Sequence, residues 1–206
     1  MKIALNFGME KLIRSLACAG AFSVCAAAFA ADAVIKLSPP DLGRGGSLMR
    51  ALSERGSDKS FADGELSAKD LSDLLWAANG VNRPDSGKRT APSALNRQDI
   101  KIYVCLKSGA YLYNPKDSLL GKVSDADLRQ SSAPATFVLV SDFNDRWSPL
   151  DAGIVSQNIS LFCSANGLAN YPHTTMDADA LVKALKLKAP QTPMICNSVG
   201  YKKEGK

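Results

Sequence analysis

Residues 71–100, LSDLLWAANGVNRPDSGKRTAPSALNRQDI, constrain the fold most, because an apolar helical pattern runs directly into a long polar loop. Apolar side chains recur there at helical spacing, at Leu71, Leu74, Leu75 and Ala78. Ser67 and Asp70 have the spacing of a capping box before this pattern. Gly80 stands where the residue just past a helix is expected, so a helix should end near Asn79.

The loop after this helix is rich in cations and amides and has hardly any acid. These groups are Arg83, Lys88, Arg89, Ser93, Asn96 and Arg97. A mere connection between packed elements has no need of such chemistry, since long loops that lack secondary structure are usually functional or disordered. The sequence therefore predicts an anionic, hydrogen-bonding ligand at this loop.

The N-terminal segment has the pattern of a secretory signal. Lys2, Lys11 and Arg14 are followed by an uncharged, alanine-rich run over residues 16–29 and by an A-x-A motif that ends at Ala30. A second possible cleavage site ends at Ala33. The alternative, a membrane anchor, needs about twenty strongly apolar residues, and this run is shorter. We therefore expect cleavage without stable membrane insertion, and a periplasmic or secreted protein.

The organisation that follows is a signal peptide over residues 1–30, an extended lead-in over 31–46 and one domain over 47–206. Removal of residues 1–30 takes away three cations and one anion, which lowers the formal charge from +5 to +3. This charge is too small to indicate a nucleic-acid partner.

Three cysteines remain after cleavage, each within an apolar segment: Cys105, Cys163 and Cys196. An odd number cannot pair completely within one chain, and no two have C-x-x-C spacing. Buried thiols that pack as small apolar groups are favoured over a redox pair. With a single histidine, the chain has no residue set that indicates a metal site.

Hydrophobic periodicity predicts the remaining elements. Helices are expected after the cap Ser47, over residues 149–165 and after the cap Asp177. Strands are expected over residues 99–106, 110–114, 135–140 and 192–199, the first two joined as a hairpin at Ser108 and Gly109. Residues 117–129 have the pattern of short helical turns, and residues 170–176 that of a loop that carries His173, an exposed loop histidine rather than a base.

Several segments together resemble the nitroreductase family of flavin enzymes, and in particular short SagB-type dehydrogenase-like members. The segments are LLWAANGVNR, RTAPSA and DAGIVSQNISLFCSANGL. Pro92, Ser93, Asn96 and Gln98 match the P-S-x-x-N-x-Q pattern, although Asp99 and Ile100 replace the Pro-Trp that often follows. The resemblance covers residues 49–200.

The resemblance implies a single α+β domain of nitroreductase type, with a mixed central sheet flanked by helices. It also implies a homodimer with FMN at the subunit interface. Arg55, Ser57 and Lys59 match the R-x-S-x-K segment at the FMN phosphate, where a solvated charged turn is the alternative. The flavin ring would lie against the second segment, at Pro92, Ser93, Ala94 and Asn96. Lys202 is a further phosphate candidate, and a frayed basic tail is the alternative.

A flavin oxidoreductase is the function that this resemblance implies. The flavin carries the chemistry, so no catalytic side chain is assigned. NAD(P)H or another donor supplies electrons, and a small organic molecule accepts them. At His173 the sequence YPHTT lacks the Glu-Gly pair that many members have near flavin N5. Because NAD(P)H is scarce outside the cytoplasm, a non-enzymatic secreted flavin- or small-ligand-binding module stays as the alternative, together with a redox protein fed by a different donor.

Overall fold

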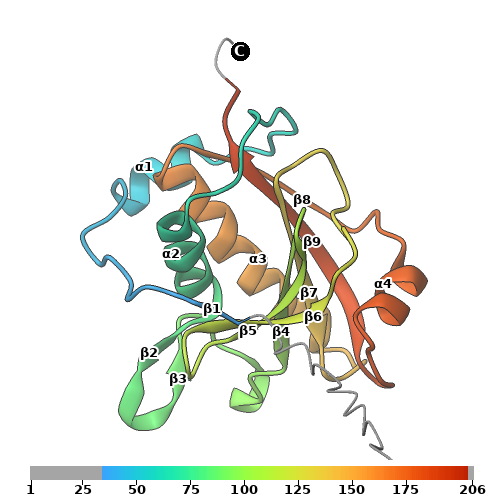
Figure 1. The fold of residues 1–206 in the computed structure, drawn as a ribbon. Helices are drawn as coiled ribbons and strands as arrows, with labels where there is room; N and C mark the ends of the chain where they lie inside the picture. Colours follow the sequence, from blue (N-terminus) through green and yellow to red (C-terminus); the bar gives the residue numbers. More distant parts are fainter. Residues whose placement is uncertain (1–33, 204–206) are drawn as a thin grey trace, which may run out of the picture. The chain divides into compact units, whose positions relative to one another are not determined.

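The computed structural model describes residues 34–203, so the expected signal peptide lies outside the described part of the chain. One seven-stranded sheet has the strand order β1-β6-β5-β4-β7-β9-β8 (Figure 1). Its strands are β1 (Val34–Lys36), β4 (Ile100–Leu106), β5 (Gly109–Asn114), β6 (Leu119–Ser124), β7 (Ala135–Ser141), β8 (Leu168–His173) and β9 (Thr192–Tyr201). The helices are α1 (Leu48–Glu54), α2 (Ala68–Asn79), α3 (Ser148–Ala165) and α4 (Ala178–Ala184). A hairpin of β2 (Val81–Arg83) and β3 (Lys88–Arg89) follows α2.

Every pairing in this sheet is antiparallel among the described strands, which corrects the expected mixture of strand directions. Helix α3 connects β7 to β8, and these two strands do run in the same direction. However, β9 lies between them and is antiparallel to both. The crossover helix therefore does not produce a parallel pair within the chain. The α+β class itself is confirmed.

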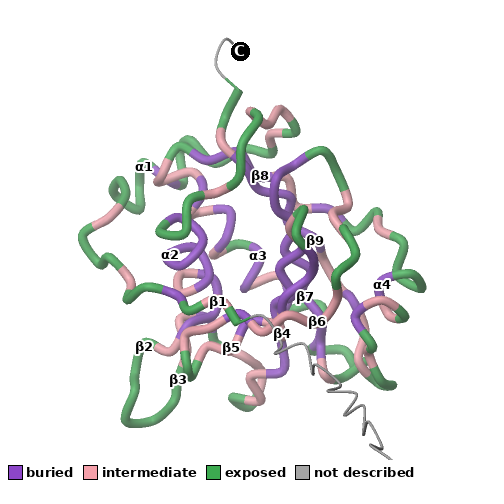
Figure 2. Tube along the Cα trace, in the orientation of Figure 1, coloured by how far each residue is buried: buried purple, intermediate pink, exposed green. Residues whose placement is uncertain are grey.

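Two apolar cores lie on opposite faces of the sheet. The larger contains α2 and α3 residues, among them Leu74, Leu75 and Ile159, packed on Phe137 and Leu139. The smaller contains Leu181 and Leu185 of the α4 segment, packed on Tyr103, Val138 and Cys196. Figure 2 shows buried residues along β7, β9 and the inner sides of α2 and α3. All seven residues of β7 are buried, as predicted for a strand covered on both faces.

Residues 117–129 are not helical, which corrects the sequence-based expectation. Residues 119–124 form β6, which pairs with β5 on one side and β1 on the other. Leu120 is fully buried in the larger core, whereas its neighbours Leu119 and Gly121 are only partly buried. This alternation has a period of two, but a segment of six residues offers few positions in which to detect it.

The helix caps agree with the sequence. Ser47 and Ser67 accept hydrogen bonds from the backbone N–H groups of Arg50 and Asp70, and Asp177 accepts one from Ala180. Helix α1 differs from an ordinary amphipathic helix, since of its residues only Ala51 is buried. The apolar face predicted for it is left exposed in the single chain, at Leu48, Met49 and Leu52.

Arg44 fixes the segment before α1 to two helices. Its guanidinium pairs with Asp70 and Asp73 of α2 and donates to Asn166 just past α3, with distances of 2.9 Å to Asp73 and 2.8 Å to Asn166. The Tyr201 hydroxyl, at the end of β9, donates to the same Asp70 over 2.6 Å. This network joins the lead-in, α2 and the last strand.

The network makes the stability of the fold sensitive to acid. Burial alone would raise the pKa of Asp70, but hydrogen bonds from Ser67, Tyr201 and Arg44 outweigh it and lower the pKa. The folded chain therefore binds this proton less tightly than the unfolded chain does. The stabilisation is complete above the ordinary carboxyl pKa of about 4 and is lost as the pH falls through the lowered value.

We expect Arg44→Met to lower the melting temperature at pH 7 by several degrees, because it leaves Asp70 and Asp73 partly buried without their shared cation. Between pH 7 and pH 3.5, the melting temperature of Arg44→Met should fall by less than that of the wild type. Circular dichroism melts at both pH values measure this difference. Arg50→Met, which removes an exposed cation paired only with Glu54, is the control. An unchanged acid dependence in Arg44→Met would contradict the assignment.

Candidate functional site

The segment after α1 places Ser57 and Lys59, two of the three predicted phosphate ligands, beside β8. Arg55 caps α1 with its own backbone and has an exposed side chain. The backbone N–H of Asp58 donates to the carbonyl of Asn170 over 2.9 Å, which holds the segment against β8. The Lys59 ammonium lies 4.2 Å from the centre of the Tyr171 ring, a favourable cation–π contact.

A cavity of about 250 Å³ opens beside this segment and is lined by both Ser57 and Lys202. Ser160, Cys163 and Ser164 from the last turns of α3 form another wall. The structure therefore brings Lys202, from the end of the chain, to the same place as residues 55–59. The backbone of Lys202 also pairs with Phe61. The role of Lys202 at a phosphate stays a prediction.

The donors around this cavity fit a phosphate group. In the described part of the chain, Arg55, Lys59 and Lys202 form no ion pair with an acidic side chain. The Ser57 hydroxyl and the Lys202 ammonium line the cavity, and the exposed Arg55 and Lys59 flank Ser57 in the sequence. Together these groups match the charge of a dianion, which is best held by charge-assisted hydrogen bonds. Glu54 and Asp58 also line the cavity, but each is already engaged, with Arg50 and with the Ser60 N–H respectively.

The second predicted segment, residues 92–98, is a strained loop. Ser93 accepts the backbone N–H of Gln98 over 2.8 Å, which closes the loop. Leu95, Asn96 and Gln98 all have positive φ angles, of 54°, 55° and 52°. Leu95 is also 91% exposed. Left-handed backbone at non-glycine residues is costly and is concentrated at functional sites, and an exposed leucine in this conformation is available to a ligand or partner.

A buried carboxyl pair supports this loop from below. Asp151, in the first turn of α3, accepts the Ala94 N–H with both oxygens, over 3.1 and 3.0 Å. Burial, together with the adjacent Asp99, raises the pKa of Asp151 even though the Ala94 N–H acts against it. Asp99 accepts the Ser141 hydroxyl over 2.8 Å, and its other oxygen has no partner in the described structure. The backbone N–H of Ala94 is therefore already used within the chain, so Ala94 can contact a flavin only through its other atoms.

Within one chain the two predicted segments lie at opposite ends of α3. Residues 92–98 rest on Asp151 in its first turn, and the cavity with Ser57 is walled by Ser160 and Ser164 near its end. At 1.5 Å per residue, these positions are roughly 14 to 20 Å apart along the helix axis. One copy of the chain thus brings Ser57 to Lys202 but does not bring either to Ser93 or Asn96.

His173 is buried at the end of β8, which corrects the expectation of an exposed loop residue over 170–176. Its Nδ1 lies 3.0 Å from the Thr175 carbonyl and its Nε2 lies 3.1 Å from the Ser198 hydroxyl. Because a carbonyl only accepts, Nδ1 carries the hydrogen and Nε2 accepts from Ser198. Its ring also stacks on Tyr171, with 4.9 Å between ring centres. These contacts hold the turn after β8, where the sequence departs from the family pattern.

The sequence analysis missed Asp151, Asn170 and Tyr171. An acidic residue in the first turn of a long helix was the available signal for Asp151. Asn170 and Tyr171 were assigned to a loop, so their place beside residues 58 and 59 was not foreseen. The thiols of Cys105, Cys163 and Cys196 are free and buried, as predicted, and burial raises the pKa of each.

Fold and site together define an α+β protein in which a cavity lined by Ser57 and Lys202 and a strained loop lie at opposite ends of one long helix, α3. The family model described as the nitroreductase family matches residues 52–201. This match spans well over half of the chain, so the protein belongs to the nitroreductase family.

Solved structures agree with this assignment. A proposed nitroreductase from Ralstonia eutropha JMP134 is 32% identical, with 84% of this chain and 90% of that chain covered and a TM-score of 0.79. A nitroreductase with bound FMN from Bacteroides fragilis NCTC 9343 is 16% identical, with 78% and 91% covered and a TM-score of 0.55. A proposed NADH dehydrogenase/NAD(P)H nitroreductase from Parabacteroides distasonis ATCC 8503 is also 16% identical, with 77% and 89% covered and a TM-score of 0.56. The last two show the fold alone.

Among curated proteins, none matches this chain significantly. Residues 34–203 contain no group of three or more His, Cys, Asp or Glu side chains placed to hold a metal ion. No helix within these residues is both long enough and apolar enough to cross a membrane.

Proposed function

We propose that this protein is an exported, FMN-dependent oxidoreductase that acts as a homodimer. It passes electrons from NAD(P)H or another donor to a small organic acceptor. The observation that carries the proposal is the cavity that Ser57 and Lys202 line together, with Arg55 and Lys59 on either side of Ser57 in the sequence. The segments LLWAANGVNR and RTAPSA support a place among the short SagB-type dehydrogenase-like members.

The residues have separate tasks in holding FMN. Arg55, Lys59 and Lys202 would neutralise the phosphate, and the Ser57 hydroxyl would donate to it. Pro92, Ser93, Ala94 and Asn96 would support the ring and exclude water from one side. When bound, FMN supplies hydride acceptance and electron transfer to a second substrate. The chain itself supplies orientation, which agrees with the absence of an assigned catalytic base.

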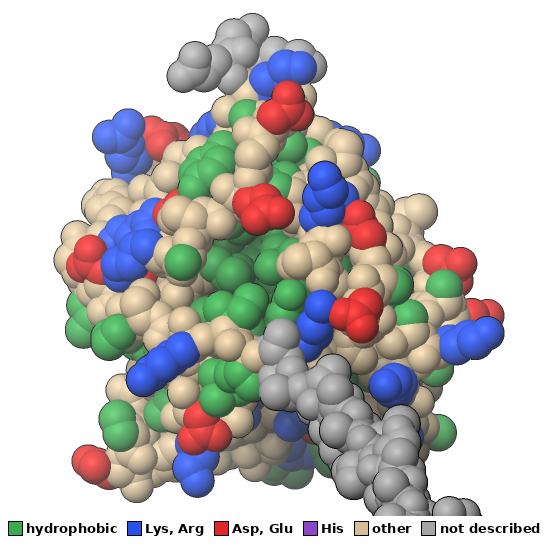
Figure 3. All heavy atoms as spheres, in the orientation of Figure 1, with side chains coloured by type: hydrophobic (Ala, Val, Ile, Leu, Met, Phe, Trp, Pro, Cys, Tyr) green, Lys and Arg blue, Asp and Glu red, His purple; other side chains and the backbone are tan. Residues whose placement is uncertain are grey.

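A homodimer completes the site in this proposal. The ring-side and phosphate-side segments lie at opposite ends of α3 in one chain, and in this proposal each flavin takes one segment from each chain. Apolar side chains stay exposed on α1 and at the start of α3, at Leu48, Met49, Leu52, Trp147 and Leu150. Figure 3 shows a further group of apolar side chains in a hollow near the centre of one face, with charged side chains around it. Large apolar surfaces on one chain are typical of obligate dimer interfaces.

Relatives support the cofactor and the donor. The Bacteroides structure contains FMN, and the Parabacteroides protein is named for NADH and NAD(P)H. Export rests on the sequence of residues 1–30 or 1–33 alone. If the chain is exported unfolded, FMN is acquired outside the cytoplasm, where reduced nicotinamide is scarce, and a donor other than NAD(P)H becomes the natural variant of this proposal.

A binding protein without turnover is the second candidate. The observation that favours it is the turn after β8, where His173 and Thr175 are hydrogen-bonded to each other in place of the Glu-Gly pair. A chain that binds flavin without positioning the flavin N5 for hydride transfer could have the same fold and the same phosphate-side residues as an enzyme.

One purification distinguishes these candidates. Protein from the periplasmic fraction should have an intact mass that corresponds to cleavage after Ala30 or Ala33, and absorption bands of oxidised flavin. Those bands should bleach when NADH or NADPH is added anaerobically. Bleaching only with dithionite would indicate another donor or a binding role. A retained Met1 would argue against export with cleavage, and a colourless protein that does not take up added FMN would overturn both flavin proposals.

A further inference from the structure

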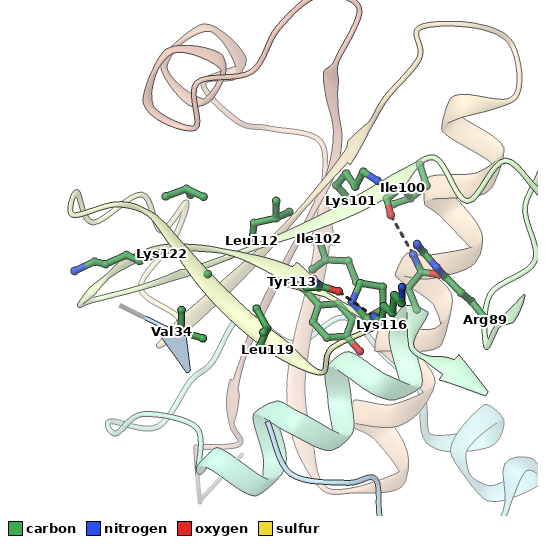
Figure 4. A pocket seen from close by; sticks show the side chains of 15 residues that line it. Val34, Arg89, Ile100, Lys101, Ile102, Leu112, Tyr113, Lys116, Leu119 and Lys122 are labelled. Atoms are coloured by element: carbon green, nitrogen blue, oxygen red, sulfur yellow. Dashed lines mark hydrogen bonds between the residues drawn. The ribbon is translucent and has the colours of Figure 1, made fainter. Parts of the chain in front are cut away.

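A second cavity shares no lining residue with the proposed phosphate site. It encloses about 560 Å³, a volume in the range of small-molecule sites. Its walls come from β1, β4, β5 and β6 and from the ends of α2 and β3, and none of its lining residues belongs to residues 55–59 or 92–98. Figure 4 shows Arg89 and Lys116 toward one end and Val34 and Lys122 toward the other.

The charge of this cavity has one sign. Arg89, Lys101, Lys116 and Lys122 line it, and no Asp or Glu does so. Lys101 pairs with Asp142 and Lys122 pairs with Asp125. Arg89 and Lys116 form no ion pair in the described part of the chain. The rest of the wall is mainly aliphatic, with Ile100, Ile102 and Leu112 among its residues.

Arg89 is the group that points to a ligand. Its guanidinium donates no hydrogen bond within the described structure, and its Nε is buried without a partner. A buried donor without an acceptor is costly, so the position is understandable if an acceptor occupies the cavity. Burial lowers the pKa of Arg89 but leaves it a cation. Tyr113 also lines the cavity, but its side chain is buried in the larger core with Leu120, on the face of β5 opposite to Leu112.

We propose that this cavity binds a small amphiphile with one carboxylate and an apolar body. The carboxylate accepts from the Arg89 guanidinium, and the apolar body lies along Leu112 and Leu119 toward Gly121 and Val34. A purely apolar ligand would leave Arg89 without an acceptor, and a compact polar anion would leave the aliphatic wall in water. Carboxylate and guanidinium match in bidentate geometry.

The probe for this site is decanoate, titrated by calorimetry into the full-length protein saturated with FMN. Decanoate should bind saturably at one site per chain, and decanol and decyltrimethylammonium should bind more weakly. Arg89→Leu should weaken decanoate binding about tenfold or more, since it removes the charged donor. Arg50→Leu, which removes an exposed cation from α1 on another part of the chain, should change it less than about twofold.

Gly121→Leu tests the same site without a change of charge. A Cβ at Gly121 meets no atom within 4 Å, and its φ angle is not in the left-handed region. The Cβ of the new residue therefore has room, and the leucine side chain should extend from β6 into the cavity. Decanoate binding should then be lost while the melting temperature and the FMN affinity stay unchanged. This variant keeps the proposal testable if Arg89→Leu does not fold.

Three results would overturn the proposal: no saturable decanoate binding, binding as tight in Gly121→Leu as in the wild type, or decanol binding as tightly as decanoate. Because FMN affinity is measured in the same samples, failure of this site and failure of the proposed flavin site are separate outcomes.

Discussion

Arg55→Ala is expected to weaken FMN binding roughly 10- to 150-fold. Charge-assisted hydrogen bonds contribute about 1.5 to 3 kcal/mol each, and 1.4 kcal/mol corresponds to a factor of ten. Arg55 is exposed, forms no ion pair in the described part of the chain and follows directly on α1, whose end is fixed by the Arg55 N–H bond to Ala51. The substitution removes a fork-shaped donor without disturbing a packed side chain.

Fluorescence titration of the flavin-free protein with FMN measures this effect. Lys183→Ala is the control, since it removes a cation from α4, on the opposite face of the sheet from α2 and α3. Its affinity should match that of the wild type, and both variants should melt as the wild type does. Equal affinities in Arg55→Ala and Lys183→Ala would remove residues 55–59 from the phosphate site.

The helices of this fold were predictable because their signals are local. Each of α1, α2 and α4 begins at a side chain that accepts a hydrogen bond from its own first turn. Strand β7 was predicted from the continuous apolar run over residues 135–140, and in the structure all seven of its residues are buried. In contrast, β1 has only three residues, and it forms a strand because it pairs with the edge of β6. A partner supplied by tertiary structure leaves no pattern in a segment this short.

The candidate site was predictable in pieces only. The two motifs, at residues 55–59 and 92–98, were found as sequence patterns. In the structure Ser57 and Lys202 line one cavity, and their binding of a phosphate stays a prediction. The support beneath the second motif was not foreseen, because Asp99 and Asp151 are 52 positions apart in sequence and meet only after β4 and α3 pack together. Separation of the two motifs along α3 is likewise a property of the folded chain.

That separation leads to the prediction with the largest expected effect. If each flavin takes its phosphate ligands from one chain and its ring contacts from the other, a dimer of two different variants can regain one intact site. One variant carries a substitution in the phosphate segment, and the other carries one in the ring segment. Arg55→Ala and Asn96→Gly are suitable partners, because glycine keeps the positive φ of Asn96 without strain. Each homodimer should bind FMN weakly at both sites, since every site then carries the same defect.

A heterodimer of the two variants has a different outcome. One of its sites combines both defects, and the other combines an intact Arg55 with an intact Asn96. Co-expression with two affinity tags, followed by tandem purification, should yield a dimer that binds one FMN with wild-type affinity. Arg55→Ala combined with Lys202→Ala is the matched control: both residues serve the phosphate from the same chain, so each site of that heterodimer keeps one defect and neither is restored. A heterodimer of Arg55→Ala and Asn96→Gly that binds no more tightly than its parents would show that both segments act on one flavin from one chain, against the distance along α3.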